Sequence, residues 1–123
     1  MNRMKTFLKS VGFAWTGVRF FFTYESNGRI QGLVALMVVA AGLFTGLTNT
    51  EWCIILLSIA LVIGLEMMNT CLERVCNMTT TDFHPMIKII KDVSAGAVLL
   101  ATITAVVIGL LIFVPYLKSY WFQ

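Results

Sequence analysis

The clearest candidates for catalytic or ligand-binding residues lie at the end of a long apolar stretch of this sequence. They are Glu66, Asn69 and Glu73. The uncharged run Trp52–Leu65 leads into them without a break signal, so we expect one helix through both. At about 100° per residue, Glu66, Asn69, Thr70, Glu73 and Asn77 share one helix face, here named the polar stripe. Because an ionisable side chain inside a membrane segment is costly, we interpret this stripe as a functional site.

Carboxylates close to lysines indicate a site that binds a divalent metal and phosphate groups. Magnesium is usually held by one or two carboxylates together with substrate phosphates, and phosphoryl transfer also needs a base for the attacking hydroxyl. The polar groups expected at the same membrane interface are Glu25, Glu66, Asn69, Glu73, Asp82, His84, Lys88, Lys91 and Asp92. The residues alone leave three readings open, which are a metal-using membrane enzyme, a small oligomeric ion or proton pathway through Glu66 and Glu73, and structural contacts between helices.

The composition indicates one small integral membrane domain over residues 1–123. Of the 123 residues, 59% are hydrophobic and 12% are charged, whereas about a quarter of a soluble domain is charged. No glycine-rich phosphate loop is present, which excludes a soluble-kinase fold, and we expect no nucleic-acid partner.

The pattern predicts an all-α membrane protein with a surface helix and three spans. Apolar residues recur at three- and four-residue steps over residues 3–24, as in an amphipathic helix lying in the membrane interface; packing on the bundle is the alternative. The spans are expected at about residues 30–48, 52–75 and 93–116. Residues 25–29 form a polar break, and Thr81 or Asp82 is expected to cap a short helix near Pro85.

The basic residues set the expected orientation. Three spans place eight of them on one side of the membrane, namely Arg3, Lys5, Lys9, Arg19, Arg29, Arg74, Lys88 and Lys91, and leave Lys118 on the other. The positive-inside rule then puts the N-terminus and the polar stripe at the cytoplasmic face of a bacterial inner membrane.

Four motifs resemble the prokaryotic diacylglycerol kinase family, which includes undecaprenol kinases. The family pattern E-x-x-N-[ST]-[AC]-[IL]-E stands here as Glu66–Glu73, and H-x(6)-K-D followed by small residues stands as His84, Lys91, Asp92 and residues 93–99. The segment A-W-x-G-[LIV]-R is residues 14–19, and Glu25 with Arg29 matches E-x-x-x-R. The similarity covers nearly the whole chain, and the segment 108–115 resembles the undecaprenol kinases.

The resemblance implies a homotrimer with composite active sites that phosphorylates undecaprenol or diacylglycerol with ATP and Mg²⁺. By motif position, Glu66 is the catalytic base, and Glu25 and Glu73 hold the metal. The implied ATP-binding residues are Phe13, Glu25, Asn69, Glu73, Asp82, Phe83, His84, Lys91 and Asp92. The implied lipid-substrate residues are Trp15, Arg19, Arg29, Glu66 and Ala95.

The chain departs from the family pattern at three positions. Asn77 stands where diacylglycerol-specific members carry an aspartate, and Thr6 stands where they carry an arginine that contacts ATP. Gln31 replaces a histidine common in undecaprenol-kinase-like members. None of these substitutions removes a catalytic group of the family.

Overall fold

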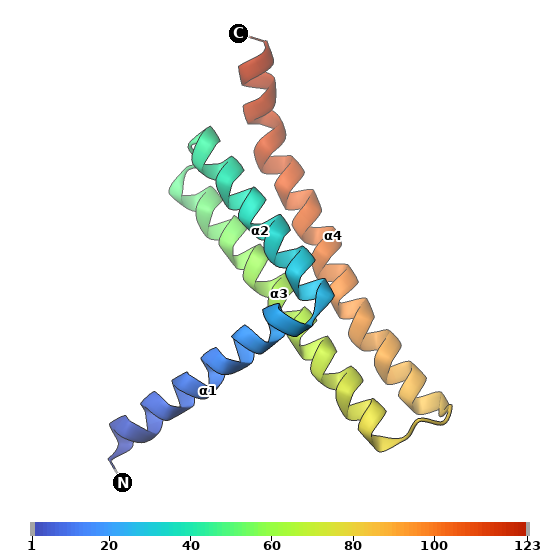
Figure 1. Ribbon diagram of the computed structural model, residues 1–123. Coiled ribbons are helices and arrows are strands. Elements are labelled where there is room, and N and C mark those ends of the chain that lie inside the picture. The colour runs from blue at the N-terminus through green and yellow to red at the C-terminus, as the bar shows by residue number, and fades with distance from the viewer. Residues whose placement is uncertain (1, 123) are drawn as a thin grey trace.

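Four α-helices make up the computed structural model, which describes residues 2–122 (Figure 1). They are α1 (Arg3–Tyr24), α2 (Ser26–Thr45), α3 (Asn49–Thr79) and α4 (Pro85–Trp121). The prediction of an all-α protein with a helix over residues 3–24 is confirmed. Helices α2, α3 and α4 are each long and apolar enough to cross a membrane. The chain is therefore a multi-pass membrane protein, as the sequence predicts.

The predicted polar break at residues 25–29 is narrower in the structure. Glu25 alone is extended, with φ −102° and ψ 119°, and Ser26 already begins α2. The first span thus starts four residues earlier than the sequence suggests. It also ends earlier, at Thr45, because Gly46 adopts the left-handed conformation (φ 73°) that a residue without Cβ tolerates.

Helix α3 is one continuous helix through the apolar run and the polar stripe, as expected. It begins at Asn49, three residues before the predicted span, because Thr48 and Glu51 form a capping box. The Thr48 Oγ1 accepts from the Glu51 N–H at 3.2 Å, and the Thr48 N–H donates to Glu51 Oε1 at 3.0 Å.

Helix α4 combines the expected short helix and the third span into one helix of 37 residues. The expectation that Thr81 or Asp82 caps this helix is wrong. His84 is the cap, since its Nδ1 accepts from the Met86 N–H at 3.2 Å and Pro85 occupies the first helical turn. No glycine or proline interrupts the segment from Met86 to Val93, so the helix continues into the span.

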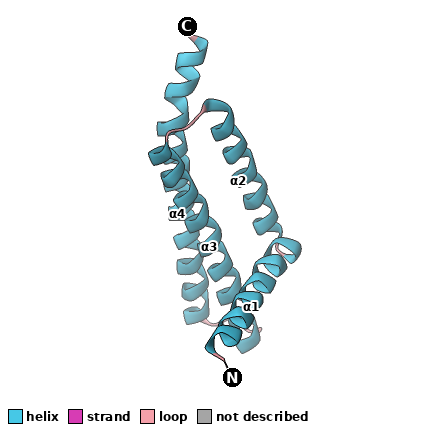
Figure 2. Ribbon diagram, turned by 90° about the vertical axis from the view of Figure 1, so that its left-hand side faces the viewer, coloured by secondary structure: helices cyan, strands magenta, loops and turns pink. Residues whose placement is uncertain are grey.

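The α3–α4 hairpin extends beyond α2. Helix α3 has 31 residues and α2 has 20, which correspond to about 46 and 30 Å at 1.5 Å per residue. Figure 1 shows α3 and α4 side by side, continuing past the α1–α2 corner. In Figure 2, α2 diverges from α4. The short core of Leu47, Ile55 and Ile112 begins directly after Gly46, which ends α2, so it lies near the α2–α3 turn.

Most large apolar side chains are exposed on the single chain. Phe44 is 95% exposed, and Leu57 and Leu111 are each 71% exposed. In a membrane such side chains contact lipid tails or neighbouring subunits instead of water. Helix α1 is exposed along nearly its whole length, and it packs on the bundle near its C-terminal end, where Phe21 is its buried residue.

The corner between α1 and α2 depends on a glycine. Phe21 is 4% exposed, and its ring covers Gly28 so closely that a Cβ there would lie 2.6 Å from Phe21 Cε2. Gly12, in contrast, has open space around its Cα hydrogen.

We predict that Gly28→Ala lowers the thermal unfolding temperature in detergent, because the Phe21 ring must move. Overpacking of this kind costs about 1–3 kcal/mol. Gly12→Ala is the matched control and should keep or raise the unfolding temperature, since alanine favours a helix by about 1 kcal/mol over glycine. Equal melting curves for the two variants would show that the corner does not require glycine.

Candidate active site

Glu66 is a buried carboxylate held by two amides. It lies on α3 and is 5% exposed. Its Oε1 accepts from Asn27 Nδ2 at 3.2 Å, and its Oε2 accepts from Gln31 Nε2 at 3.4 Å. Both donors come from α2, four residues apart and therefore on one helix face.

The early start of α2 makes this arrangement possible. Because only Glu25 is extended, Asn27 and Gln31 lie in the first two turns of α2 and can face α3 together. A buried carboxylate needs such donors, since a buried acceptor without a partner costs about 1–3 kcal/mol and a charged one costs more.

The polar stripe continues from Glu66 towards solvent. Asn69 is 7% exposed and donates through Nδ2 to Glu73 Oε1 at 3.2 Å, while its buried Oδ1 has no partner among residues 2–122. Thr70 is half-buried, and Glu73 and Asn77 are exposed. The stripe therefore joins a buried carboxylate to one that water and ions can reach.

Glu25 contacts α3 at Arg74, the residue that follows Glu73. It forms an ion pair with Arg74, whose guanidinium also lies 5.3 Å from the centre of the Phe20 ring. Within residues 2–122, no three His, Cys, Asp or Glu side chains cluster as a complete metal site. Magnesium takes one or two carboxylates and completes its shell with phosphates and water. The exposed Glu73 carboxylate, hydrogen-bonded to Asn69, fits a magnesium site of this kind, which phosphates and water would complete.

A cavity of about 590 Å³ lies where α3 turns into α4. Five of the residues implied for ATP binding line it, namely Asp82, Phe83, His84, Lys91 and Asp92. Lys91 Nζ donates to Asn77 Oδ1 at 2.8 Å, and Lys88 pairs with Asp92 at 2.6 Å. His84 uses Nδ1 for its cap, so this nitrogen is occupied.

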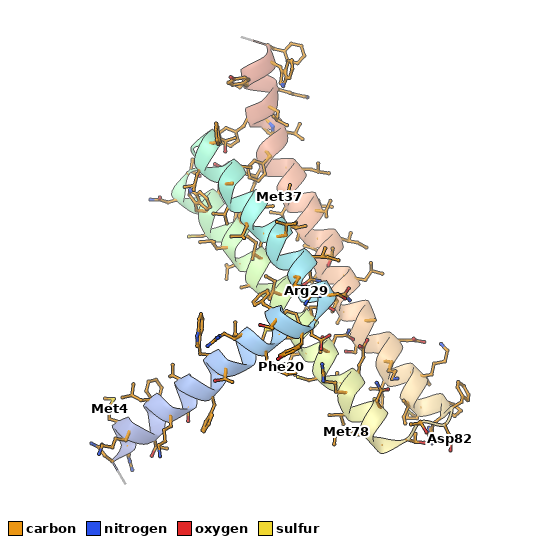
Figure 3. The ribbon with its side chains drawn as sticks, in the orientation of Figure 1. Met4, Phe20, Arg29, Met37, Met78 and Asp82 are labelled. Atoms are coloured by element: carbon orange, nitrogen blue, oxygen red, sulfur yellow. The ribbon has the colours of Figure 1, made fainter. Side chains whose placement is uncertain are left out.

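Within residues 2–122, the other residues implied by the motifs make no hydrogen bond or ion pair with the polar stripe. Phe13 and Trp15 are 75% and 62% exposed on α1, and Arg19 is exposed on the same helix. Ala95 is exposed on α4. Arg29 Nη1 donates to the Thr23 carbonyl at 2.6 Å and so joins α1 to α2. Figure 3 shows Arg29 at this corner and Asp82 at the far end of the α3–α4 hairpin.

Comparison with known proteins decides the family. Residues 12–113 match the family described as prokaryotic diacylglycerol kinase. The chain belongs to this family. The resemblance drawn from the motifs is therefore confirmed.

Named relatives of this kinase family include two kinds of lipid kinase. The chain is 38% identical over 113 residues to a diacylglycerol kinase of Synechocystis sp., covering 91% of this chain but only 65% of that relative. It is 35% identical over 116 residues to the undecaprenol kinase of Bacillus subtilis, covering 94% of each chain. It is 27% identical over 100 residues to the diacylglycerol kinase of Escherichia coli strain K12, covering 81% of this chain and 82% of that enzyme.

Sequence reasoning missed the two amides that hold Glu66. Gln31 is identified from the sequence only as a departure from the kinase family pattern, and Asn27 falls within the predicted polar break at residues 25–29. Their four-residue spacing was the available signal, but it has meaning only once α2 is known to begin at Ser26. The contact with Glu66, 39 positions from Asn27, is tertiary.

We predict that Asn27→Leu lowers the lipid kinase turnover number, because one oxygen of Glu66 loses its donor. A loss of about 1–3 kcal/mol corresponds to roughly a five- to hundred-fold fall. Asn49→Leu, on the exposed first turn of α3, is the control and should leave turnover within about two-fold of wild type. Unchanged turnover in Asn27→Leu with intact folding would contradict a role for this contact.

Proposed function

We propose that this protein transfers the γ-phosphoryl group of Mg-ATP to the hydroxyl of a membrane lipid, either undecaprenol or diacylglycerol. The observation that carries the proposal is the buried Glu66, oriented by Asn27 and Gln31 at the level where α2 begins. The named activities of the relatives support the same reaction class. No contact in the described part of the chain favours ion conduction.

Glu66 acts as the general base in this proposal. It accepts the proton of the lipid hydroxyl while the hydroxyl oxygen forms a bond to the γ-phosphorus. The bond from that phosphorus to the bridging oxygen breaks, and ADP leaves. The two amide donors fix the plane of the carboxylate, so that its remaining lone pairs are aimed before the lipid arrives.

Glu25 and Glu73 would hold Mg²⁺, which supplies charge neutralisation for the phosphates. Glu25 is paired with Arg74 in the structure, so metal binding must compete with this ion pair. Asn69 fixes one oxygen of Glu73 and keeps the carboxylate turned along the polar stripe. These two glutamates fit the one-or-two-carboxylate pattern of magnesium–nucleotide sites.

The cavity at the α3–α4 turn is the proposed nucleotide site. Lys91 and Lys88 supply positive charge, and Phe83, 79% exposed, offers an apolar surface beside it. From Glu66 to Asn77 the rise along α3 is about 16 Å. An extended nucleotide that starts in the cavity would direct its phosphates along the polar stripe towards Glu66.

A homotrimer with sites shared between subunits is also part of the proposal. Phe13, Trp15 and Arg19 lie on a helix that leaves the bundle, so they can contribute to a site only if α1 meets another subunit or the lipid surface. The exposed apolar faces of α2, α3 and α4 would supply subunit contacts. In this proposal the site faces the cytoplasm at the inner membrane, which the excess of basic residues on that side supports.

The first prediction from this function concerns the lipid product. Purified protein in lipid-containing micelles should transfer label from γ-labelled ATP, with Mg²⁺, to undecaprenol or to a diacylglycerol. Glu66→Gln keeps the shape of the side chain but lacks the base, and turnover should fall about 10²- to 10⁴-fold. No label in either lipid with folded wild-type protein, or wild-type turnover in Glu66→Gln, would refute the proposal.

A second prediction tests whether Lys91 binds the nucleotide directly or only adds to the overall positive charge of the protein. Lys91→Met should raise the KM for ATP about ten- to hundred-fold, because a charge-assisted hydrogen bond contributes about 1.5–3 kcal/mol. Lys118→Met, at the opposite end of α4, is the control and should leave that KM unchanged. If both variants bind ATP as wild type does, the cavity is not the nucleotide site.

A third prediction concerns the metal. Glu73→Gln should raise the Mg²⁺ concentration that gives half-maximal turnover by about ten-fold or more, because the amide supplies no negative charge. Glu51→Gln, at the other end of α3, serves as the control. A Mg²⁺ dependence in Glu73→Gln that matches wild type would remove Glu73 from the metal site.

A further inference from the structure

The two lysines of the cavity at the α3–α4 turn are held by partners of different charge. Lys88 Nζ lies 2.6 Å from Asp92 Oδ2, one turn further along α4, so these two charges offset each other. The two side chains are 62% and 64% exposed. An incoming anion therefore meets little net charge at this ion pair. The other residues of the cavity that can carry charge are Asp82, His84 and Lys91.

Lys91 has a neutral partner. Its Nζ donates to Asn77 Oδ1 at 2.8 Å, and no ion pair joins it to a carboxylate within residues 2–122. Because an ammonium group only donates, the contact also fixes which atom of the Asn77 amide faces Lys91. One of the three ammonium N–H groups is used in this contact, and two are left for other acceptors. The direction of Lys91 is thus set while its charge is kept.

Asn77 brings this charge to the solvent end of the polar stripe. It lies on α3 one turn after Glu73, a rise of about 6 Å along the helix axis. Lys91 belongs to α4 and is half-buried, so the contact places a cation of one helix against the polar stripe of the other. A phosphate bound to Lys91 would then lie about one helical turn from the Glu73 carboxylate.

We propose that Asn77 is a positioning residue for the nucleotide, which holds Lys91 against the polar stripe without neutralising it. Lys88 contributes by occupying Asp92, the carboxylate next to Lys91 in the sequence. The cavity then offers one uncompensated lysine, and the triphosphate is drawn to the wall that the polar stripe forms. This inference rests on the proposed kinase function and names a residue that orients its nucleotide.

Asn77→Asp tests the proposal in the full-length protein, because it adds a negative charge with little change of shape. The new carboxylate would pair with Lys91, so the KM for ATP should rise about five- to ten-fold, with turnover at saturating ATP within about two-fold of wild type. Asn77→Leu removes the contact without adding charge and should raise this KM only about two-fold. An ATP KM in Asn77→Asp no higher than in Asn77→Leu would overturn the proposal.

Asn49→Asp is the matched control for the added charge. Asn49 is exposed on the first turn of α3, at the opposite end of the helix from the cavity. The same change of charge there should leave the KM for ATP unchanged, because the distance along α3 exceeds the screening length at physiological salt. A rise equal to that of Asn77→Asp would show that only the total charge of the protein matters, and the proposal would be wrong.

The salt dependence separates a charge effect from a purely structural one. The wild-type KM for ATP should rise with added NaCl, because ions screen the attraction between Lys91 and the phosphates. Asn77→Asp should show a shallower rise, whereas Asn77→Leu should keep the wild-type slope. The same slope in all three proteins would contradict the claim that Asn77 leaves the Lys91 charge available.

A double-mutant cycle tests whether Asn77 acts through Lys91. In protein that already carries Lys91→Met, Asn77→Asp should raise the ATP KM by less than about two-fold, since the cation that it would neutralise is gone. A full additive increase would mean that the new carboxylate repels the nucleotide directly. Asn77 would then not be a positioning residue for Lys91.

The failure of this inference differs from the failure of the proposed function. The rise of the unfolding temperature on addition of Mg-ATP reports nucleotide binding without turnover. Wild-type protein that Mg-ATP stabilises but that labels no lipid would refute the kinase function, and the Asn77 variants would still be compared by this stabilisation. Wild-type protein that labels lipid, with equal ATP KM in Asn77→Asp and Asn77→Leu, would keep the kinase and overturn the role of Asn77.

Discussion

A carboxylate withdrawn from water must be given hydrogen-bond donors, and the position of α2 in this protein follows from that requirement. Glu66 obtains its donors from Asn27 and Gln31, which holds the first turns of α2 against the middle of α3. At its other end α2 is held by a close approach at Gly42, where a Cβ would lie 2.7 Å from the Trp52 ring. Between these two contacts α2 diverges from α4 (Figure 2), and an apolar groove lined by Val34, Val38 and Ile59 lies in this interval.

The polar stripe arranges polarity along the axis of α3. Glu66 and Asn69 are buried, Glu73 is exposed, and the cavity at the α3–α4 turn is lined by lysines and an exposed loop. A reaction between a lipid and a nucleotide needs this gradient, because the lipid lies in the apolar membrane interior and the nucleotide is dissolved in water. The extension of the α3–α4 hairpin beyond α2 provides the polar end of the gradient without breaking either helix (Figure 1).

The corner between α1 and α2 connects the surface helix to this axis. Phe21 packs on Gly28, Arg29 binds the Thr23 carbonyl, and Arg74 pairs with Glu25. These contacts fix the direction in which α1 leaves the bundle, while the rest of α1 stays exposed. The position of Glu25 is thus coupled to α3, so the metal site that we propose for it depends on the corner as well as on the polar stripe.

The sequence by itself determined the membrane class, the extent of α1, and the continuity of α3 through the polar stripe, because hydropathy and helical period are local properties. It also determined the family, through motifs that lie in order along the chain. The tertiary structure decided what local patterns could not. Glu25 alone breaks the helix, His84 caps α4, and Asn27 and Gln31 face Glu66 across two helices. The last of these joins residues 35 and 39 positions apart, and no spacing rule within one helix can specify which face of another helix will satisfy a buried carboxylate.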